Sequence, residues 1–209
     1  MEFHLVYQGK LPAAGQSNTR AREKQDIRKV FHKQLASLWN THPFLIDFMK
    51  IDERQARERE GKFVGPYPDV PPRVLEFADR YARCGYRFMP LVSQWFGCSC
   101  ALDILFLRRD GPGSLIKSGG DIDNRLKVLF DGLRMPQTCD EVCGDSPNQD
   151  ENPFYCLLED DKLISKVQVE TNWLLTPTTT GEHINDVHLI IRVKTILIEG
   201  SNKYETAFQ

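Results

Sequence analysis

The segment GGDIDNRLKVLFDGL (119–133) places two aspartates, Asp121 and Asp123, directly after two glycines and directly before an amphipathic run. One interpretation is structural, because acidic side chains in the first turn of a helix cap free N–H groups and meet the positive end of the dipole. The other is chemical. At a helix start the first aspartate can still lie in extended backbone, so that both carboxylates converge on one metal ion.

A second acidic cluster, Glu159, Asp160 and Asp161, stands immediately before a predicted strand in LEDDKLI. If the helix packs on the sheet that this strand joins, Asp161 faces the start of the helix. Three carboxylates in one place raise their own pKa values, and a divalent cation removes that repulsion. Oxygen ligands favour Mg²⁺ or Mn²⁺ over Zn²⁺, and such a site suits phosphodiester hydrolysis, in which the metal ion activates water. The structural alternative is that EDD is a turn.

Lys127 lies one helical turn after Asp123, and Asp131 lies one turn further on the same face. In a nuclease, Lys127 would hold a phosphate oxygen or stabilise the leaving group. Without a metal site, Lys127 and Asp131 would form an ordinary exposed ion pair at i, i+4 spacing. Residue types and spacing alone leave both interpretations open.

Taken together, GDIDNRLKVLFDGL and LLEDDKLISKVQV resemble the RusA family of Holliday-junction resolvases. The family pattern is D-x-D-N, then a lysine four residues after the second aspartate, then Phe-Asp, and finally a D-D pair that begins a strand. Every element is present here in that order. The resemblance implies that the catalytic residues are Asp121, Asp123, Lys127 and Asp161, of which the three aspartates bind the metal ion. It also implies supporting roles for Asn124, Asp131 and Asp160.

The resemblance implies a Mg²⁺- or Mn²⁺-dependent, structure-selective endodeoxyribonuclease that acts as a homodimer on four-way junctions or related branched DNA. Two-fold symmetry suits that substrate, because two symmetric cuts need two sites. The chain departs from the family in its greater length, in the missing run of arginines before D-x-D and in its acidic tract at 135–156. These departures weaken the junction assignment more than the nuclease assignment. Two alternatives remain: a catalytically silent resolvase-like module that binds DNA or protein, and a nuclease for another nucleic acid, such as RNA.

The rest of the sequence predicts the elements that position these residues. Strand-like patterns cover 3–9, 86–92, 98–109, 162–175 and 186–198. Helical patterns run from a Ser17 cap to about Trp39, over 41–60, over about 73–83 and from Asp121 onward. The connecting segments are a proline-rich break at 65–72, a glycine-rich loop at 110–120 and a polar loop at 135–156.

This order predicts an α/β (α+β) fold in which a mixed β-sheet carries helices mainly on one face, as the RusA resemblance also implies. At 209 residues, with 41% hydrophobic and 27% charged residues, we expect a single domain spanning 1–209. Residues 41–96 form an inserted elaboration, which we expect to pack on the core because it is too apolar for a solvated linker. The acidic loop at about 135–156 is a second insertion.

Composition bears on compartment and cofactors. No apolar run approaches the roughly 20 residues of a membrane-spanning helix, and the N-terminal stretch lacks a signal-peptide pattern, so we expect a cytoplasmic protein with no membrane partner. In that compartment the six cysteines are not expected to form a disulfide framework. Cys98 and Cys100 are expected to be buried in a strand. The better zinc candidates, although they lack C-x-x-C spacing, are Cys139, Cys143 and Cys156. The net charge of −2 does not decide whether the chain binds nucleic acid.

Overall fold

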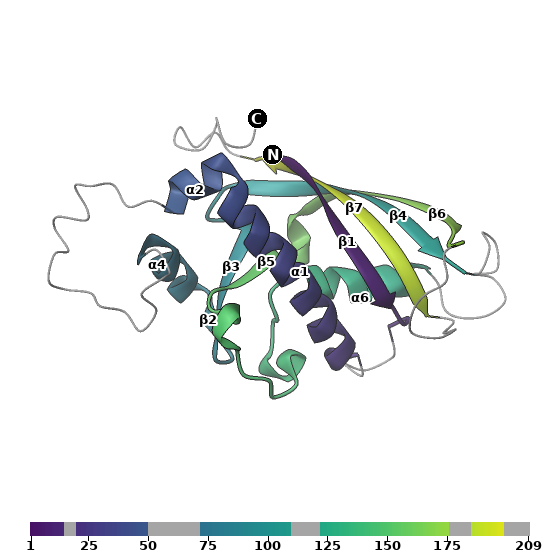
Figure 1. The fold of residues 1–209 in the computed structure, drawn as a ribbon, viewed down its shortest axis with the longest axis horizontal. Coiled ribbons are helices and arrows are strands. Elements are labelled where there is room, and N and C mark those ends of the chain that lie inside the picture. The colour runs from purple at the N-terminus through teal and green to yellow at the C-terminus, as the bar shows by residue number, and fades with distance from the viewer. Residues whose placement is uncertain (15–19, 50–71, 110–121, 176–184, 199–209) are drawn as a thin grey trace, which may run out of the picture.

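The computed structural model describes residues 1–14, 20–49, 72–109, 122–175 and 185–198. Four strands form its larger sheet, in the order β1-β7-β4-β6 (Figure 1). Their bounds are β1 Glu2–Lys10, β4 Cys98–Arg108, β6 Ile164–Trp173 and β7 Asp186–Leu197. β7 pairs antiparallel with β1 and with β4, whereas β4 and β6 pair in parallel. The sheet is therefore mixed, as the sequence predicts.

The larger sheet is buried on one face only. In β4, Leu102, Ile104 and Phe106 are buried, whereas Asp103 and Leu105 between them are partly exposed. Successive side chains of a strand point to opposite faces of the sheet, so this alternation leaves one face open to solvent. The pattern agrees with an antiparallel or mixed sheet that carries its helices on a single side.

Two helices cover the buried face, α1 (Ala21–Thr41) and α6 (Ile122–Leu133) (Figure 1). α1 buries Ile27, Phe31 and Leu35, which share one side of the helix because they are four residues apart. The two helices approach each other at Gly132, where an added Cβ would lie 2.5 Å from Cγ2 of Ile27. Any larger residue at position 132 would push α6 away from α1.

A second, three-stranded sheet has the order β2-β3-β5. Its strands are β2 Ala82–Arg83, β3 Tyr86–Val92 and β5 Phe154–Leu158, with β3 and β5 parallel. Here the structure corrects two sequence expectations. β5 begins inside the tract 135–156 that was expected to be a polar loop. The helix expected over about 73–83 ends at Arg80, so that Ala82–Arg83 can pair with β3.

The expected α+β class is confirmed: mixed sheets are combined with α1, α6 and two shorter helices, α2 (Pro43–Met49) and α4 (Pro72–Arg80). α2 and α4 meet the loop after β3 through an aromatic group whose members are Phe48, Phe77, Trp95 and Phe96. The described part of the 41–96 segment thus shares one hydrophobic core with the larger sheet. The Ser17 cap, the loop at 110–120, residues 50–60 of the helix expected over 41–60 and most of the break at 65–72 lie outside the described residues.

Cys84 and Cys139 form a disulfide, although the sequence predicts no disulfide framework. Cys84 and Gly85 both have positive φ, which suits the two-residue turn that joins β2 to β3. The fold brings this turn to Cys139, 55 residues further along the chain, and a separation of that size conceals the pairing from sequence inspection. The bond removes Cys139 from the zinc candidates, and Cys156 is buried in β5. Cys98 and Cys100 are buried in β4, as expected.

Candidate active site along helix α6

Asp123 and Lys127 lie on the exposed side of α6, one turn apart. Neither side chain has a hydrogen-bond or ion-pair partner among the described residues, so both are available to a ligand or substrate. Asp121, the first predicted metal ligand, directly precedes α6 and lies outside the described residues. The pair Asp123–Lys127 is therefore the described part of the predicted site at this end of the helix.

The buried side chain of Arg125 anchors the start of α6 to the end of the larger sheet. The Arg125 guanidinium donates to the Leu11 carbonyl at 2.6 Å and to Asn185 Oδ1 at 3.0 Å. Asn124, for which the resemblance implies a supporting role, accepts a hydrogen bond from the Ala14 N–H at its backbone carbonyl, at 3.0 Å. These bonds hold the exposed residues of the first two turns on a rigid base.

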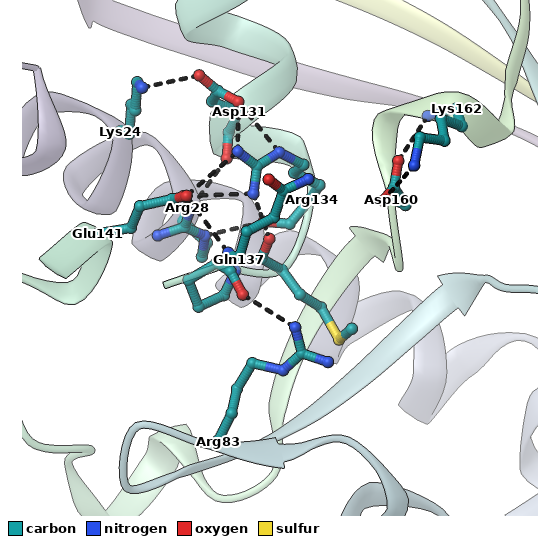
Figure 2. Close-up of polar contacts among 11 residues, drawn as sticks. Lys24, Arg28, Arg83, Asp131, Arg134, Gln137, Glu141, Asp160 and Lys162 are labelled. Carbon is teal, nitrogen blue, oxygen red and sulfur yellow. Dashed lines mark hydrogen bonds and ion pairs between the residues drawn. The ribbon is translucent and has the colours of Figure 1, made fainter. Parts of the chain in front are cut away.

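Asp160 and Asp161 occupy the turn between β5 and β6, where Asp160 caps the short 3-10 helix η3 (Asp161–Leu163). Its carboxylate accepts from the Lys162 N–H at 3.0 Å (Figure 2). That bond lowers the pKa of Asp160, whereas partial burial and the hydrogen-bonded Asp160 carboxyl raise the pKa of Asp161. The turn therefore holds two adjacent carboxyl groups, as the sequence predicts, and the Asp160 carboxyl disfavours the charged form of Asp161.

Asp131 belongs to a buried ion network, which also includes Lys24, Arg28, Arg134 and Glu141 (Figure 2). Its carboxylate accepts from Lys24 Nζ at 2.8 Å and from Arg134 Nη2 at 2.6 Å. Burial alone would raise the pKa of Asp131, but the hydrogen bond from Lys24 and the charge of Arg134 outweigh burial and lower it. Asp131 is thus neither the exposed partner of Lys127 nor a free carboxylate.

Glu141 closes the same network from the other side. Arg134 Nη2 lies 3.3 Å from Glu141 Oε1, and Arg28 Nη2 lies 3.4 Å from Glu141 Oε2. Burial lowers the pKa of Arg28 to about 10, and the charge of Glu141 opposes that effect. Arg28 also donates to the backbone carbonyls of Asp131 and Arg134, so the network ties α1 to the end of α6.

Asp161 belongs to the turn after β5, and β5 is joined to the chain directly after α6. The end of α6 is joined to the end of β5 by a hydrogen bond from the Met135 N–H to the Leu158 carbonyl, three residues before Asp161. Burial raises the pKa of Asp161, and the charge of Arg134 opposes that effect. Asp123 lies eight residues before Asp131, about 12 Å along the helix axis. Within the described ranges, no group of three or more His, Cys, Asp or Glu side chains is arranged to hold a metal ion.

The acidic tract folds against the basic side of α1, which sequence inspection did not foresee. Asp145 lies 3.0 Å from Arg22 Nη1 and 2.9 Å from Lys29 Nζ, and Glu151 lies 3.8 Å from Lys29. The sequence offered one signal of this contact, which is charge complementarity. The helix is rich in lysine and arginine, whereas the tract 135–156 holds acidic residues and no lysine or arginine. Part of the positive charge of α1 is therefore neutralised within the chain.

Comparison with known proteins identifies no relative: no family model, no curated protein and no solved structure matches the chain. Within the described residues, no helix combines the length and the apolar character needed to cross a membrane.

Proposed function

We propose that the protein is a Mg²⁺- or Mn²⁺-dependent endodeoxyribonuclease that acts in the cytoplasm, as a homodimer, on branched DNA such as four-way junctions. One observation supports this most directly: Asp123 and Lys127 stand exposed and unpaired among the described residues, at the anchored start of α6 and directly after the D-x-D pair. An ordinary surface ion pair at i, i+4 spacing would join Asp123 to Lys127, and no such ion pair is present among the described residues.

The donor chemistry fits a hard divalent cation. Carboxylate oxygens are the ligands that Mg²⁺ prefers, and Asp123 has one carboxylate that no described cation occupies. The predicted partner at this end is Asp121. The adjacent carboxyls of Asp160 and Asp161 are a second oxygen-rich position, and a cation would relieve their mutual repulsion. When bound, Mg²⁺ would supply an activated water and neutralise charge on the phosphodiester.

Lys127 would contribute charge and no metal ligand. Its ammonium offers three donors and no lone pair, so it can hold a non-bridging phosphate oxygen or steady the leaving oxygen. The exposed side of α6 leaves it room to meet a strand of DNA. The basic side of α1 is a weaker candidate for that contact, because Asp145 and Glu151 occupy part of it.

The activity is tested with a labelled four-way junction, a linear duplex of the same sequence and a single-stranded RNA, each in Mg²⁺ or EDTA. We expect cleavage of the junction in Mg²⁺ and none in EDTA, with slower or no cleavage of the linear duplex. Cleavage of the RNA alone would contradict the junction as substrate and support the alternative that the protein is a nuclease for RNA. Cleavage that persists in EDTA would contradict a metal-dependent mechanism.

We expect Lys127→Ala to slow cleavage by about 10²- to 10³-fold, the usual effect of removing one electrostatic stabiliser. Metal binding, followed by calorimetric titration with Mn²⁺, should be unchanged, because lysine is not a ligand. The matched control is Lys162→Ala, which removes an equally charged side chain that is 85% exposed and lies beside Asp160. Equal losses in the two variants would show that only general charge matters.

One observation favours a second function, a catalytically silent module that binds DNA. Asp131, for which the resemblance implies a supporting role, is held in a buried ion network by Lys24 and Arg134 and is not free to act at Asp123. Such a module would bind the labelled junction in a gel-shift assay with equal affinity in Mg²⁺ and EDTA. It would cut the junction with neither Mg²⁺ nor Mn²⁺.

A further inference from the structure

The two edges of the larger sheet differ in how they are protected. At the β1 edge, Gln34 of α1 reaches Val6, accepting from its N–H at 2.9 Å and donating to its carbonyl at 2.7 Å. At the β6 edge, the strand Ile164–Trp173 pairs on its inner side with β4, and no second strand pairs with it in the described part of the chain (Figure 1). An open strand of this length is a template for pairing with another chain.

The side chains of β6 remain open as well as its edge. Val167 is 41% exposed and Trp173 is 54% exposed, although both face the side of the sheet that carries the helices. Lys166, Gln168 and Glu170 line the open face. From Lys166 onward the register of β6 with β4 is regular, and apolar residues left uncovered on such an edge strand indicate a surface that another element covers.

The sequence of β6 is complementary to itself. In SKVQVET (165–171), residues at equal distances from Gln168 are a valine and a valine, a lysine and a glutamate, and a serine and a threonine. We propose that β6 pairs antiparallel with β6 of a second copy of this chain, with Gln168 opposite the partner's Gln168. The larger sheets of the two copies then form one continuous sheet across a two-fold axis.

In this register the cross-strand pairs within 165–171 are complementary. Lys166 lies opposite the partner's Glu170 on the open face, and the two-fold axis repeats that pair. Val167 lies opposite the partner's Val169 on the helix-covered face, and Ser165 lies opposite the partner's Thr171. Opposite charges, paired β-branched residues and paired hydroxyls are the cross-strand combinations that stabilise antiparallel sheets.

Other antiparallel registers lose this complementarity. Moving the axis by one residue, to Val167 or Val169, leaves Lys166 and Glu170 without opposite charges. Moving it by two residues places Lys166 opposite itself or Glu170 opposite itself, which is repulsive. The charges therefore specify one register, as charged residues on edge strands commonly do. Lys166 lies 3.9 Å from Asp103 of its own chain, and the partner's Glu170 would add a second carboxylate.

The β6 pairing would be the interface of the homodimer in the proposed function, on which this inference rests. Its tests involve no DNA, so a failed dimer test and a failed cleavage test can be told apart. Light scattering coupled to gel filtration should give twice the chain mass of 24.1 kDa for the wild type. Lys166→Glu and Glu170→Lys each create two like-charge pairs and should weaken the dimer by roughly tenfold or more. The double variant Lys166→Glu/Glu170→Lys restores both opposite-charge pairs and should restore the dimer.

Lys194→Glu is the matched control, because it makes the same charge change at an exposed position of β7, inside the sheet and away from the edge. It should dimerise as the wild type does, and circular dichroism would establish that each variant is folded. A monomeric wild type would overturn the proposal. So would single variants that dimerise like the wild type, or a double variant that remains monomeric.

Cross-linking tests the register directly, in a Cys143→Ser background that removes the partly exposed free thiol. Gln168→Cys places two thiols face to face at the axis, within reach of a disulfide, and should give a covalent dimer on a non-reducing gel. Lys166→Cys places its thiols four residues apart along the paired strands and should give none. Equal cross-linking of the two variants, or none with Gln168→Cys, would overturn the register.

Discussion

The Asp123→Asn protein is expected to bind branched DNA as tightly as the wild type or more tightly, and to cut it more than about 10³-fold more slowly. Asparagine keeps the shape of the side chain but removes the charge that holds a divalent cation, and the metal ion contributes several kcal/mol to the transition state. The lost negative charge also reduces repulsion of the phosphate backbone. Gel shifts measure binding and single-turnover assays in Mg²⁺ measure cleavage.

The same assays on neighbouring carboxylates locate the site. Asp121→Asn is expected to behave as Asp123→Asn does, and Asp161→Asn should also abolish cleavage if its carboxyl joins the metal site during the reaction. Asp140→Asn, an exposed carboxylate of the acidic tract, is the matched control and should cut normally. Near wild-type cutting by the Asp123→Asn protein would contradict the assigned mechanism. Near wild-type cutting by the Asp161→Asn protein alone would confine the metal site to the start of α6.

Arg134→Met is expected to destabilise the fold by about 3–5 kcal/mol, because it leaves Asp131 and Glu141 as buried charges without their shared partner. Urea unfolding followed by circular dichroism gives the free energy of unfolding. The slope with denaturant should stay constant if only stability changes. Arg22→Ala is the control: it removes an exposed partner of Asp145 and should lower the free energy of unfolding far less than Arg134→Met does.

The network also predicts a dependence on pH. The pKa of Asp131 in the folded protein is held below its ordinary value of 3.8, so its ion pairs contribute fully above that value. Their contribution is lost as the pH falls below 3.8 toward the lower folded pKa, because the carboxyl then takes up a proton. Asp131→Asn should flatten this part of the stability profile. An unchanged profile would show that other groups govern acid unfolding.

The sequence by itself determined the class of the fold and the chemistry to look for. Alternation along 98–109 and 186–198 predicts strands buried on one face, and the helical spacing after Asp121 predicts α6, because both patterns are local and repeat with the period of the element. The D-x-D and E-D-D clusters mark the acidic residues whatever the fold does with them. The self-complementary charges of β6 were likewise present in the sequence, but they can pair with a second copy only because β6 lies at an open edge of the sheet.

Only the tertiary structure decided which of these residues meet. It drew Asp131 into an ion network with Lys24 and Arg134, joined Cys84 to Cys139 across 55 residues, and set the Asp161 turn beside the end of α6. It also began β5 inside the tract that was expected to be a loop, where the strand pairs with β3 and is buried. Such contacts join segments far apart in the chain, and no local period or spacing encodes them.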